Sequence, residues 1–395
     1  MPISTPLSFA GVAKEVTKGT PVTPATAFLP VKTITPEDVI HYIPVEVLQG
    51  AMPKVYGDVQ GYRNTTFETA GPIFADTFGW PLFGVLGDVS FTATRSVSDG
   101  VTTSGSPNVS SATGSFTSAD LGKSIGHANI PAGAVIQTVS SGTAVIMSQN
   151  STATGSSLTL VIGPTSWHVG NVLNSVAGGG QPTSNTLYDY YNATSARQYA
   201  GVQWHETMIK FTAEGLLEHT SKATGLVASV QVTKPTQSFT AITPTPVWTG
   251  IVTVGGTVVS TVADGDVTIT RTMELVPAMT GTQQYASVWI GNIEAKFKLS
   301  VIADVADTEY LRFTGNTQPS LDLNFTVGSG ATAQQLVIHT TKAAYEKAKL
   351  NRGKQWVAWD VEGQFIGNST DVGSSGGFGV CTMKLGNAVG TGTYQ

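Results

Sequence analysis

Carboxylate pairs are the side chains in this 395-residue sequence with the clearest capacity for catalysis. Glu206 and Glu214 share one face of a predicted strand, and Asp360 and Glu362 lie close together in another. Two carboxylates that face each other across a cleft can hydrolyse a glycosidic bond, one as general acid and the other as base or nucleophile. Carboxylates on a solvated strand face are far more common. We therefore interpret both pairs as surface charge.

Other motifs of catalysis and metal binding are missing from the sequence. Six histidines are scattered without an H-E-x-x-H pattern, and Cys381 is the single cysteine, so no zinc site is indicated. His205 falls on the apolar face of its predicted strand, as core or interface histidines do. The glycines at 178–180 precede Gln-Pro-Thr, unlike a phosphate-binding loop, and no G-x-S-x-G elbow occurs. We predict no enzymatic activity, no metal and no cofactor.

Composition indicates a folded protein that packs against other copies of itself. Charged residues make up 12% of the chain, about half of the ~25% found in an average protein. Serine, threonine and 44 glycines take their place. Seven tryptophans and fifteen phenylalanines argue against disorder. A net charge of −5 argues against a nucleic-acid-binding face.

Neither export nor membrane insertion is indicated. A single cysteine permits no internal disulfide, which fits folding in a reducing cytoplasm. The first residues lack a charged segment followed by an apolar one, so no secretory signal is expected. No run of ~18 apolar residues is present to cross a bilayer.

The elements that must position these side chains are strands. Alternation of apolar and polar residues predicts strands with one buried and one polar face. This alternation occurs near residues 203–214, 321–327 and 357–365. The pattern is clearest around residues 293–301, where an apolar set alternates with a charged set: Ile293, Ala295, Phe297, Leu299 and Val301 against Glu294, Lys296 and Lys298. We predict an all-β (mainly β) fold, a sandwich or barrel.

Two local features interrupt this pattern. Residues 340–353, TTKAAYEKAKLNRG, are rich in helix formers and end at Gly353 after basic residues, which predicts one short helix. Gly255-Gly256 and Asp264-Gly265, each between apolar runs, predict two turns of a hairpin meander. Asp264 and Asp266 lack the later carboxylates of a calcium-binding loop, and we assign them to the second turn.

The character of the sequence changes between residues 92 and 164. This stretch has no tryptophan or tyrosine and little charge, and Gly, Ser and Pro separate its short apolar runs. The flanking segments 83–91 and 165–174 would continue one domain without it, as insertions at loop tips allow. We predict that residues 36–91 and 165–395 form one β domain and that residues 92–164 form an inserted β module.

The first 35 residues follow neither pattern. Three prolines exclude a helix over residues 11–32, and the apolar residues there are scattered rather than alternating. We predict an extended N-terminal arm over residues 1–35.

Three stretches resemble the major tail proteins (tail tube proteins) of phages with long, non-contractile tails. Residues 11–31, GVAKEVTKGTPVTPATAFLPV, resemble their N-terminal arm, and residues 47–88 resemble the segment that follows it. Residues 341–394 resemble their helix–strand–strand ending. The resemblance covers most of the chain outside residues 92–164, and its weight lies in the order and combination of short motifs. The inserted module is similar to small β-repeats of phage tail and fibre proteins.

The resemblance implies a structural virion protein with a tail-tube-like fold. Members form hexameric rings that stack into a hollow tube around a continuous inner β-barrel, through which the genome is ejected into the host. The implied partners are further copies of the chain, the tape measure, tail terminator and distal tail proteins, and double-stranded DNA that passes without specific binding; no membrane partner is expected. The implied location is the virion tail, after assembly in the host bacterial cytoplasm.

The resemblance also suggests roles for particular residues. The arm would contact a neighbouring subunit, with Lys14, Glu15, Thr20, Pro21 and Phe28 as candidate contacts. Polar strand faces would line the lumen, with Glu206, Glu214, Glu294, Asp322, Asp360 and Glu362 as candidates. We expect a net negative lumen, although Lys210, Lys296 and Lys298 share these faces. The inserted module would lie on the tube exterior.

Alternative functions stay open at the level of sequence. A carbohydrate-binding or adhesive virion protein would use the inserted module and the tryptophans Trp204, Trp356 and Trp359 for recognition. A β-rich hydrolase would need the carboxylate pairs in a cleft. A capsid shell protein fits less well, because the sequence indicates no long spine helix.

Overall fold

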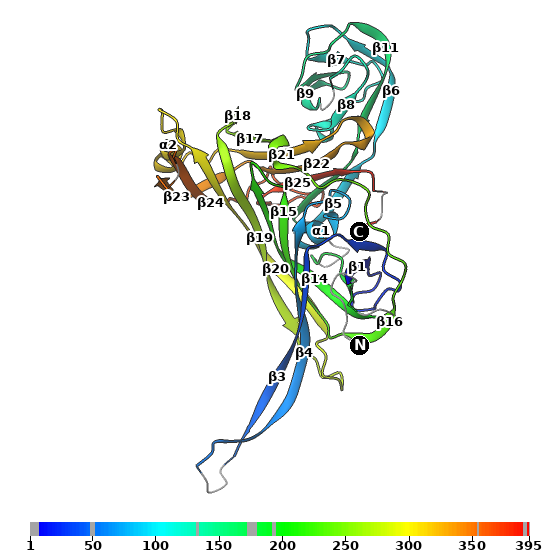
Figure 1. Ribbon diagram of the computed structural model, residues 1–395, viewed down its shortest axis with the longest axis vertical. Coiled ribbons are helices and arrows are strands. Elements are labelled where there is room, and N and C mark those ends of the chain that lie inside the picture. The colour runs from blue at the N-terminus through cyan, green and yellow to red at the C-terminus, as the bar shows by residue number, and fades with distance from the viewer. Residues whose placement is uncertain are drawn as a thin grey trace.

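The computed structural model describes residues 8–47, 52–131, 134–171, 180–191, 195–353, 355–389 and 393–394. Within these ranges the chain is built mainly from strands, arranged in three sheets (Figure 1). The predicted all-β fold is confirmed. Two short α-helices occur in the described part of the chain, α1 (Gly79–Leu86) and α2 (Thr308–Gly315).

The largest sheet has twelve strands and forms the elongated body in Figure 1. The main path runs β2-β1-β13-β14-β19-β20-β24-β23. A branch leaves β14 through β15 and then β4 to β3, and β16 also pairs with β14. Its strands are β1 (Phe9–Lys14), β2 (Ala27–Leu29), β3 (Thr33–Glu46), β4 (Val55–Pro72), β13 (Asn185–Tyr190), β14 (Ser195–Thr212), β15 (Glu218–Gly225), β16 (Ser229–Thr233), β19 (Val262–Val276), β20 (Ser287–Ile302), β23 (Ala343–Asn351) and β24 (Ala358–Phe365).

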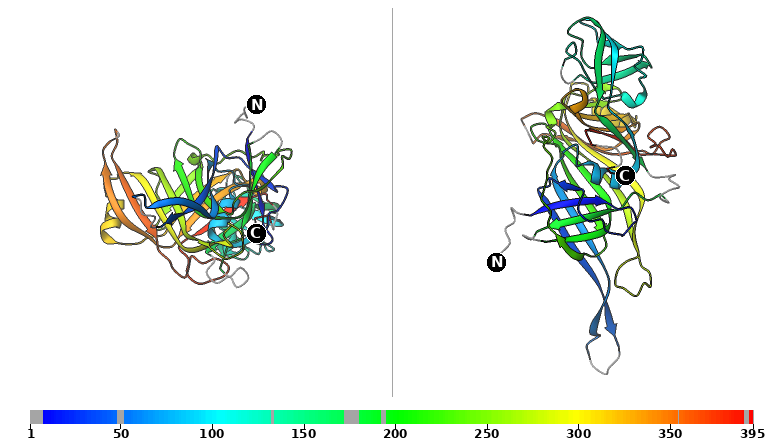
Figure 2. Two further views of the ribbon diagram at one scale, coloured as in Figure 1. Left: turned by 90° about the horizontal axis from the view of Figure 1, so that it is seen from below. Right: turned by 90° about the vertical axis from the view of Figure 1, so that its right-hand side faces the viewer.

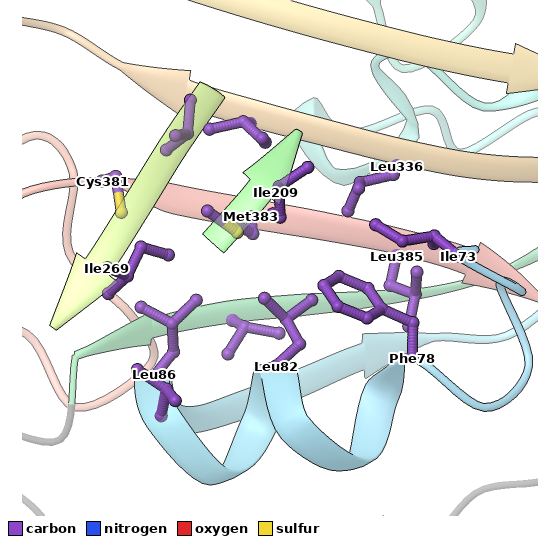
Figure 3. Close-up of a cluster of buried hydrophobic side chains, with 14 of the residues drawn as sticks. Ile73, Phe78, Leu82, Leu86, Ile209, Ile269, Leu336, Cys381, Met383 and Leu385 are labelled. Atoms are coloured by element: carbon purple, nitrogen blue, oxygen red, sulfur yellow. The ribbon is translucent and has the colours of Figure 1, made fainter. Parts of the chain in front are cut away.

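A seven-stranded sheet packs against this body in the order β18-β17-β21-β22-β25-β12-β5. Its strands are β5 (Gly87–Thr92), β12 (Thr165–Asn171), β17 (Gly250–Val254), β18 (Thr257–Val258), β21 (Leu321–Val327), β22 (Gln334–Thr340) and β25 (Thr382–Asn387). Ile209 and Ile269 of the larger sheet share one apolar core with Leu336 and Met383 of the smaller sheet (Figure 3). The sandwich therefore arises because alternating strands bury their apolar faces against each other.

Helix α1 is buried over its whole length in this core. Leu82 and Leu86 point from the helix toward the two sheets (Figure 3). A side chain at Gly84 would place its Cβ 2.3 Å from the Trp204 ring, so the glycine allows the indole to lie directly on the helix. Because the segment is apolar on all sides, its sequence does not carry the one-sided pattern typical of a surface helix.

Residues 95–163 form a separate six-stranded sheet, drawn at the top of Figure 1, in the order β8-β11-β6-β7-β10-β9. It has its own apolar cluster, which includes Ile125, Val145 and Ile162. The flanking strands β5 and β12 pair with each other, Ser166 opposite Thr92, so both ends of the insertion lie close together. The strands are β6 (Arg95–Thr102), β7 (Asn108–Ser110), β8 (Ser124–Gly126), β9 (Ile136–Ser141), β10 (Ala144–Met147) and β11 (Gly155–Gly163). Among the described residues there are three short 3-10 helices: η2 (Ser118–Asp120), η3 (Val247–Thr249) and η4 (Gly330–Thr332).

The helix predicted over residues 340–353 is wrong, because this segment contains strand β23. β23 pairs antiparallel with β24, with Ala348 opposite Val361. Ala343 and Tyr345 are buried in the sandwich core, while Lys347 and Lys349 are exposed. The ladder hydrogen bonds and this burial outweigh the helix propensity of alanine, lysine and glutamate, which amounts to a few tenths of a kcal/mol per residue, roughly.

One of the two predicted turns is also wrong. Gly255-Gly256 does join β17 to β18, with Val254 paired to Thr257. Asp264, Gly265 and Asp266 instead lie inside the long strand β19. A Cβ at position 265 would lie 2.4 Å from the Lys298 carbonyl oxygen and 2.7 Å from the Phe211 ring, so this glycine allows close packing within a sheet rather than a reversal of the chain.

The described part of the N-terminal segment forms strands β1 and β2 of the chain's own sheet. β1 pairs with β13 along its whole length and also with β2. Val12 and Ala13 are fully buried. The expectation that this segment docks on a neighbouring subunit stays a prediction for the residues that remain exposed.

Candidate assembly surfaces

A long hairpin of β3 and β4 extends beyond the body of the molecule (Figures 1 and 2). The pairing of β4 with β15 ends at Thr65. Beyond that residue, toward the tip of the hairpin, β3 and β4 pair with each other. Residues 41–47 and 52–60 are exposed apart from the half-buried Tyr56. A two-stranded ribbon of this kind is marginally stable alone in water.

One face of the hairpin is apolar. Ile43 lies directly opposite Val59, and Val45 lies opposite Gly57 on the same face. Ile43 is 59% exposed and Val59 54% exposed. Tyr42 and Gln60 form the adjacent pair on the opposite face. We call Ile43, Val45 and Val59 the hairpin face; it is an unpartnered apolar surface on the described chain, of the kind that marks an interaction site.

The base of the hairpin is held in a fixed direction by the loop between β19 and β20. The Tyr62 and Tyr285 rings stack with centroids 4.9 Å apart, and the Tyr62 hydroxyl donates to the Ala278 carbonyl at 3.0 Å. The Arg63 amide donates to the Gln283 carbonyl at 2.8 Å. These contacts orient the ribbon before any partner binds, which lowers the entropy cost of association.

Sequence reasoning did not identify this hairpin as a site. The available signal was the alternation of Ile43, Val45 and Val47 with Pro44 and Glu46, which is typical of a strand. The exposure of that face is a property of the tertiary structure, because most alternating strands bury their apolar side.

Four of the six candidate lumenal carboxylates share the polar face of the large sheet. Glu206 pairs with Lys222 at 2.9 Å and Glu294 with Lys296 at 3.4 Å. Asp360 accepts hydrogen bonds from Ser300 at 2.9 Å and from Asn351 at 2.8 Å, and Glu362 pairs with Lys347 at 3.3 Å. Each of these four carboxylates therefore has a cation, or an amide and a hydroxyl, as a direct partner.

Charges of opposite sign alternate across this face. The strand registers place Lys210 beside Asp266, Asp266 beside Lys298, Lys298 beside Glu362, and Glu362 beside Lys347. We call these five residues the charged row. A shallow concavity of about 530 Å³ lies along it. Since cross-strand neighbours lie about 4.5–5.5 Å apart, each charge has an opposite charge nearby. With three lysines and two carboxylates, the row is mixed in sign rather than uniformly negative.

The other two candidates lie elsewhere. Glu214 is exposed in the turn after β14. Asp322 belongs to β21 of the smaller sheet, where its Oδ1 lies 2.5 Å from Nδ1 of His339. The His339 Nε2 lies 3.3 Å from Oδ1 of the buried Asp371. One imidazole therefore joins two carboxylates, and it connects β21 and β22 to the segment before β25.

Hydrogen bonds set the protonation of this cluster. The hydrogen bonds that the His339 ring donates to Asp322 and then to Asp371 raise the pKa of His339 to about 10. Burial acts to raise the pKa of Asp371, but hydrogen bonds from His339, Asn368 and Thr341 outweigh it and lower the pKa to about 2. His339 is therefore an imidazolium at neutral pH, and Asp371 is a carboxylate.

The cluster predicts a pH-dependent stability. The raised His339 pKa contributes stability that is complete below pH ~6.5, the ordinary histidine value, and that is lost as the pH rises toward about 10. The lowered Asp371 pKa contributes stability above pH ~3.9 that is lost toward about 2. In thermal unfolding, His339→Gln should therefore lower Tm most between about pH 4 and 6.5, and the difference should shrink by pH 10. His41→Gln, at an exposed position on the hairpin, serves as the control; a His339→Gln effect that does not vary with pH would contradict the assignment.

The candidate arm residues divide into buried and exposed groups. The buried Glu15 carboxylate accepts hydrogen bonds from the Gly201 amide at 2.7 Å and the Gly19 amide at 2.8 Å. Lys14 and Phe28 are half-buried, and the Phe28 ring packs edge-on against Phe9. Thr20 and Pro21 are exposed in the loop between β1 and β2. Glu15 therefore holds the segment on its own chain, and Thr20 and Pro21 are accessible to a neighbour.

The inserted module is docked on the outer face of the smaller sheet. Lys384 and Gln335 donate to the carbonyl oxygens of Leu121 and Gly122, and Ser124 donates to the Gly330 carbonyl at 3.0 Å. Trp167 and Leu385, which neighbour His168 and Lys384 along β12 and β25, are buried in the sandwich core. Because successive strand residues point to opposite faces, the module lies on the side of this sheet away from the core.

Other kinds of site are not indicated in the described ranges. No group of three or more His, Cys, Asp or Glu residues there could hold a metal ion. No helix among the described residues is long and apolar enough to cross a membrane. Trp204 is fully buried, with its Nε1 donating to Asn185 at 2.9 Å, so it does not contribute to a surface platform for sugars. His205 is half-buried beside Thr224 and lines a concavity with Glu68 and Lys222, whereas the alternation of its strand places it on the apolar face.

Comparison with known protein families agrees with this architecture. Residues 6–377 match the sequence model of a family described as phage tail tube protein. The chain therefore belongs to the phage tail tube protein family, whose members are structural components of the virion tail and assemble into a tube. No curated protein matches the sequence of this chain.

Proposed function

We propose that this protein is the major tail protein of a phage with a long, non-contractile tail. It polymerises as stacked hexameric rings, and the tube conducts the genome into the host. The observation that carries the proposal is the hairpin face, an apolar ribbon that extends from one end of the body. A protein that exposes such a surface at one end is suited to bind another copy along a tube axis.

The layer order supports an assignment of inside and outside. From one side to the other, the chain presents the charged row, the large sheet, the core, the smaller sheet and the inserted module. We assign the concave polar face with Glu206, Glu294, Asp360 and Glu362 to the lumen and the module to the exterior. A module of this size in the lumen would obstruct DNA, whereas on the outside it leaves the channel free.

The remaining partners follow from this role. The tape measure protein would occupy the lumen during assembly, and the tail terminator and distal tail proteins would contact the two ends of the tube. DNA would pass along the lumen without specific binding. Assembly would take place in the host bacterial cytoplasm. Thr20 and Pro21 are the arm residues best placed to contact a neighbouring subunit, since both are exposed.

Electron microscopy of the purified protein tests the proposal. With increasing protein concentration we expect rings and then tubes in negative stain, with sixfold symmetry in end views, and a matching loss of monomer in sedimentation velocity. A protein that stays monomeric at every concentration, and that is absent from the tail of virions whose genome encodes it, would overturn the proposal.

A further inference from the structure

The end of the large sheet opposite the hairpin carries a second exposed apolar surface. A groove of about 240 Å³ lies between β18, the end of β20 and helix α2. Val258, Ile302 and Trp359 contribute apolar lining, and the charged side chains in the lining are Asp304, Glu309 and Arg312. Beside it, Val305 is fully exposed and Leu311 is 59% exposed. We call this region the α2 groove.

The α2 groove has rigid walls. Tyr310 stacks on Trp359 with centroids 5.1 Å apart and an interplanar angle of 18°. Glu309 forms an ion pair with Arg312, and its other oxygen accepts a hydrogen bond from the Tyr345 hydroxyl at 2.8 Å. Asp304 accepts a hydrogen bond from the Thr308 amide at 3.1 Å at the start of α2. The exposed apolar side chains therefore lie on a braced surface rather than on a loose loop.

Strand directions place the groove and the hairpin at opposite ends. β4 runs antiparallel to β15, β15 to β14, β14 to β19, and β19 to β20, so β4, β14 and β20 share one direction. The outer end of the hairpin is the start of β4, whereas Ile302 is the last residue of β20. Figure 1 shows the hairpin at the lower end of the sheet and α2 near the upper end.

We propose that the α2 groove of one copy receives the hairpin face of a second copy in the adjacent ring. Both surfaces expose apolar side chains, both are braced in the free chain, and they lie at opposite ends of one sheet. Outward from Thr65, β4 continues for about ten residues, which span roughly 30 Å, enough to reach well onto a neighbouring copy. A contact between two different surfaces at opposite ends of the chain repeats head to tail, and it gives an open stack where its rotation does not close a ring.

This inference rests on the proposed tube and specifies the surfaces that join its rings. The occupant is a second copy of the chain, because the chain itself carries an unpartnered apolar ribbon at the other end. Val258, Ile302 and Leu311 should be covered in the tube by Ile43, Val45 and Val59. The assignment predicts that a reagent joining the two surfaces links copies in series.

Cysteine cross-linking tests the contact. The protein with Val59→Cys and Val258→Cys is assembled and treated with a short bis-maleimide. Cys381 is fully buried, and burial raises the pKa of its thiol to about 12, so the native cysteine gives little background. We expect a denaturing-gel ladder that extends beyond hexamers. The matched control joins Val59→Cys with Val101→Cys on the inserted module and should give no ladder.

The outcomes separate this inference from the proposed function. Tubes without a ladder would overturn the α2 groove as the receiving surface while the tube itself stands. Failure of the unsubstituted protein to form tubes would instead remove the proposed function.

A second measurement does not depend on the cysteine geometry. Leu311→Glu protein keeps its hairpin but replaces an exposed apolar side chain beside the groove with a carboxylate, and Val59→Glu protein keeps its groove but has a charged hairpin. Neither should polymerise alone, and their mixture should form a single joint that stops growing. If Leu311→Glu protein polymerises as well as the unsubstituted protein, the assignment is wrong.

Discussion

Val59→Glu protein is expected to fold normally and to fail to form tubes at concentrations where the unsubstituted protein polymerises. Val59 is 54% exposed in the free chain and pairs across the hairpin with Ile43, outside the part of β4 that pairs with β15. Its substitution therefore leaves the core intact. Covering a valine side chain contributes ~1.5–3 kcal/mol, and a buried unpaired carboxylate adds a further cost. Since ~1.4 kcal/mol is a tenfold change in affinity, the critical concentration should rise at least about tenfold.

A neighbouring position supplies the control. Gln60→Glu introduces the same charge one residue away, on the opposite face of the hairpin. It should polymerise nearly as well as the unsubstituted protein. Circular dichroism and thermal unfolding of both variants check that the body is unchanged, and sedimentation velocity measures assembly. Equal loss of assembly in both variants would show that the hairpin does not act through its apolar face.

Glu362→Lys is expected to slow DNA release from assembled phage tails. Glu362 lies between Lys298 and Lys347 in the charged row, so the substitution places three lysines side by side on the face assigned to the lumen. Each copy loses one negative charge and gains one positive charge, so its net charge rises by two. Lysines that contact DNA phosphates release counterions, which makes binding stronger at low salt. We expect release at least about tenfold slower at low salt, with the difference disappearing as the salt concentration rises.

Glu362→Gln separates the two consequences of this change. It removes the carboxylate without adding a lysine, so it should slow release much less than Glu362→Lys. Adjacent like charges also destabilise a sheet by ~0.2–1 kcal/mol per pair, which thermal unfolding of the two variants measures. Release kinetics for Glu362→Lys that match those of the native phage at low salt would show that this face does not contact the DNA path.

Local sequence pattern predicted several strands correctly. Ala295, Phe297, Leu299 and Val301 are buried along β20, as their alternation with Glu294, Lys296 and Lys298 predicted. Leu321, Leu323 and Phe325 are buried along β21 in the same way. These predictions succeed because period-two alternation is a property of the chain alone and specifies which face is apolar.

The failures arise where a distant strand decides the local structure. Residues 343–351 favour a helix by composition, yet β24 supplies the ladder and the core supplies the burial that make them a strand. The Asp264-Gly265 pair is typical of a turn, yet Gly265 lies within β19. Its lack of a side chain leaves room there for the Phe211 ring and the Lys298 backbone. Apolar helix α1 could not be distinguished from a buried strand by pattern, since all of its sides are covered.

The same distinction between local sequence pattern and contacts of distant strands applies to the candidate sites. The sequence by itself determined that the chain is β-rich, sparsely charged and suited to pack against copies of itself, because composition and alternation are local properties. It also located the carboxylates Glu206, Glu294, Asp360 and Glu362 on polar strand faces. The tertiary structure alone decided that lysines in the charged row face acidic residues across strands, that Asp322 belongs to a histidine cluster, and that Glu15 is held within its own chain. It also decided that the hairpin face and the α2 groove lie at opposite ends, because strand order and direction depend on pairings between residues far apart in sequence.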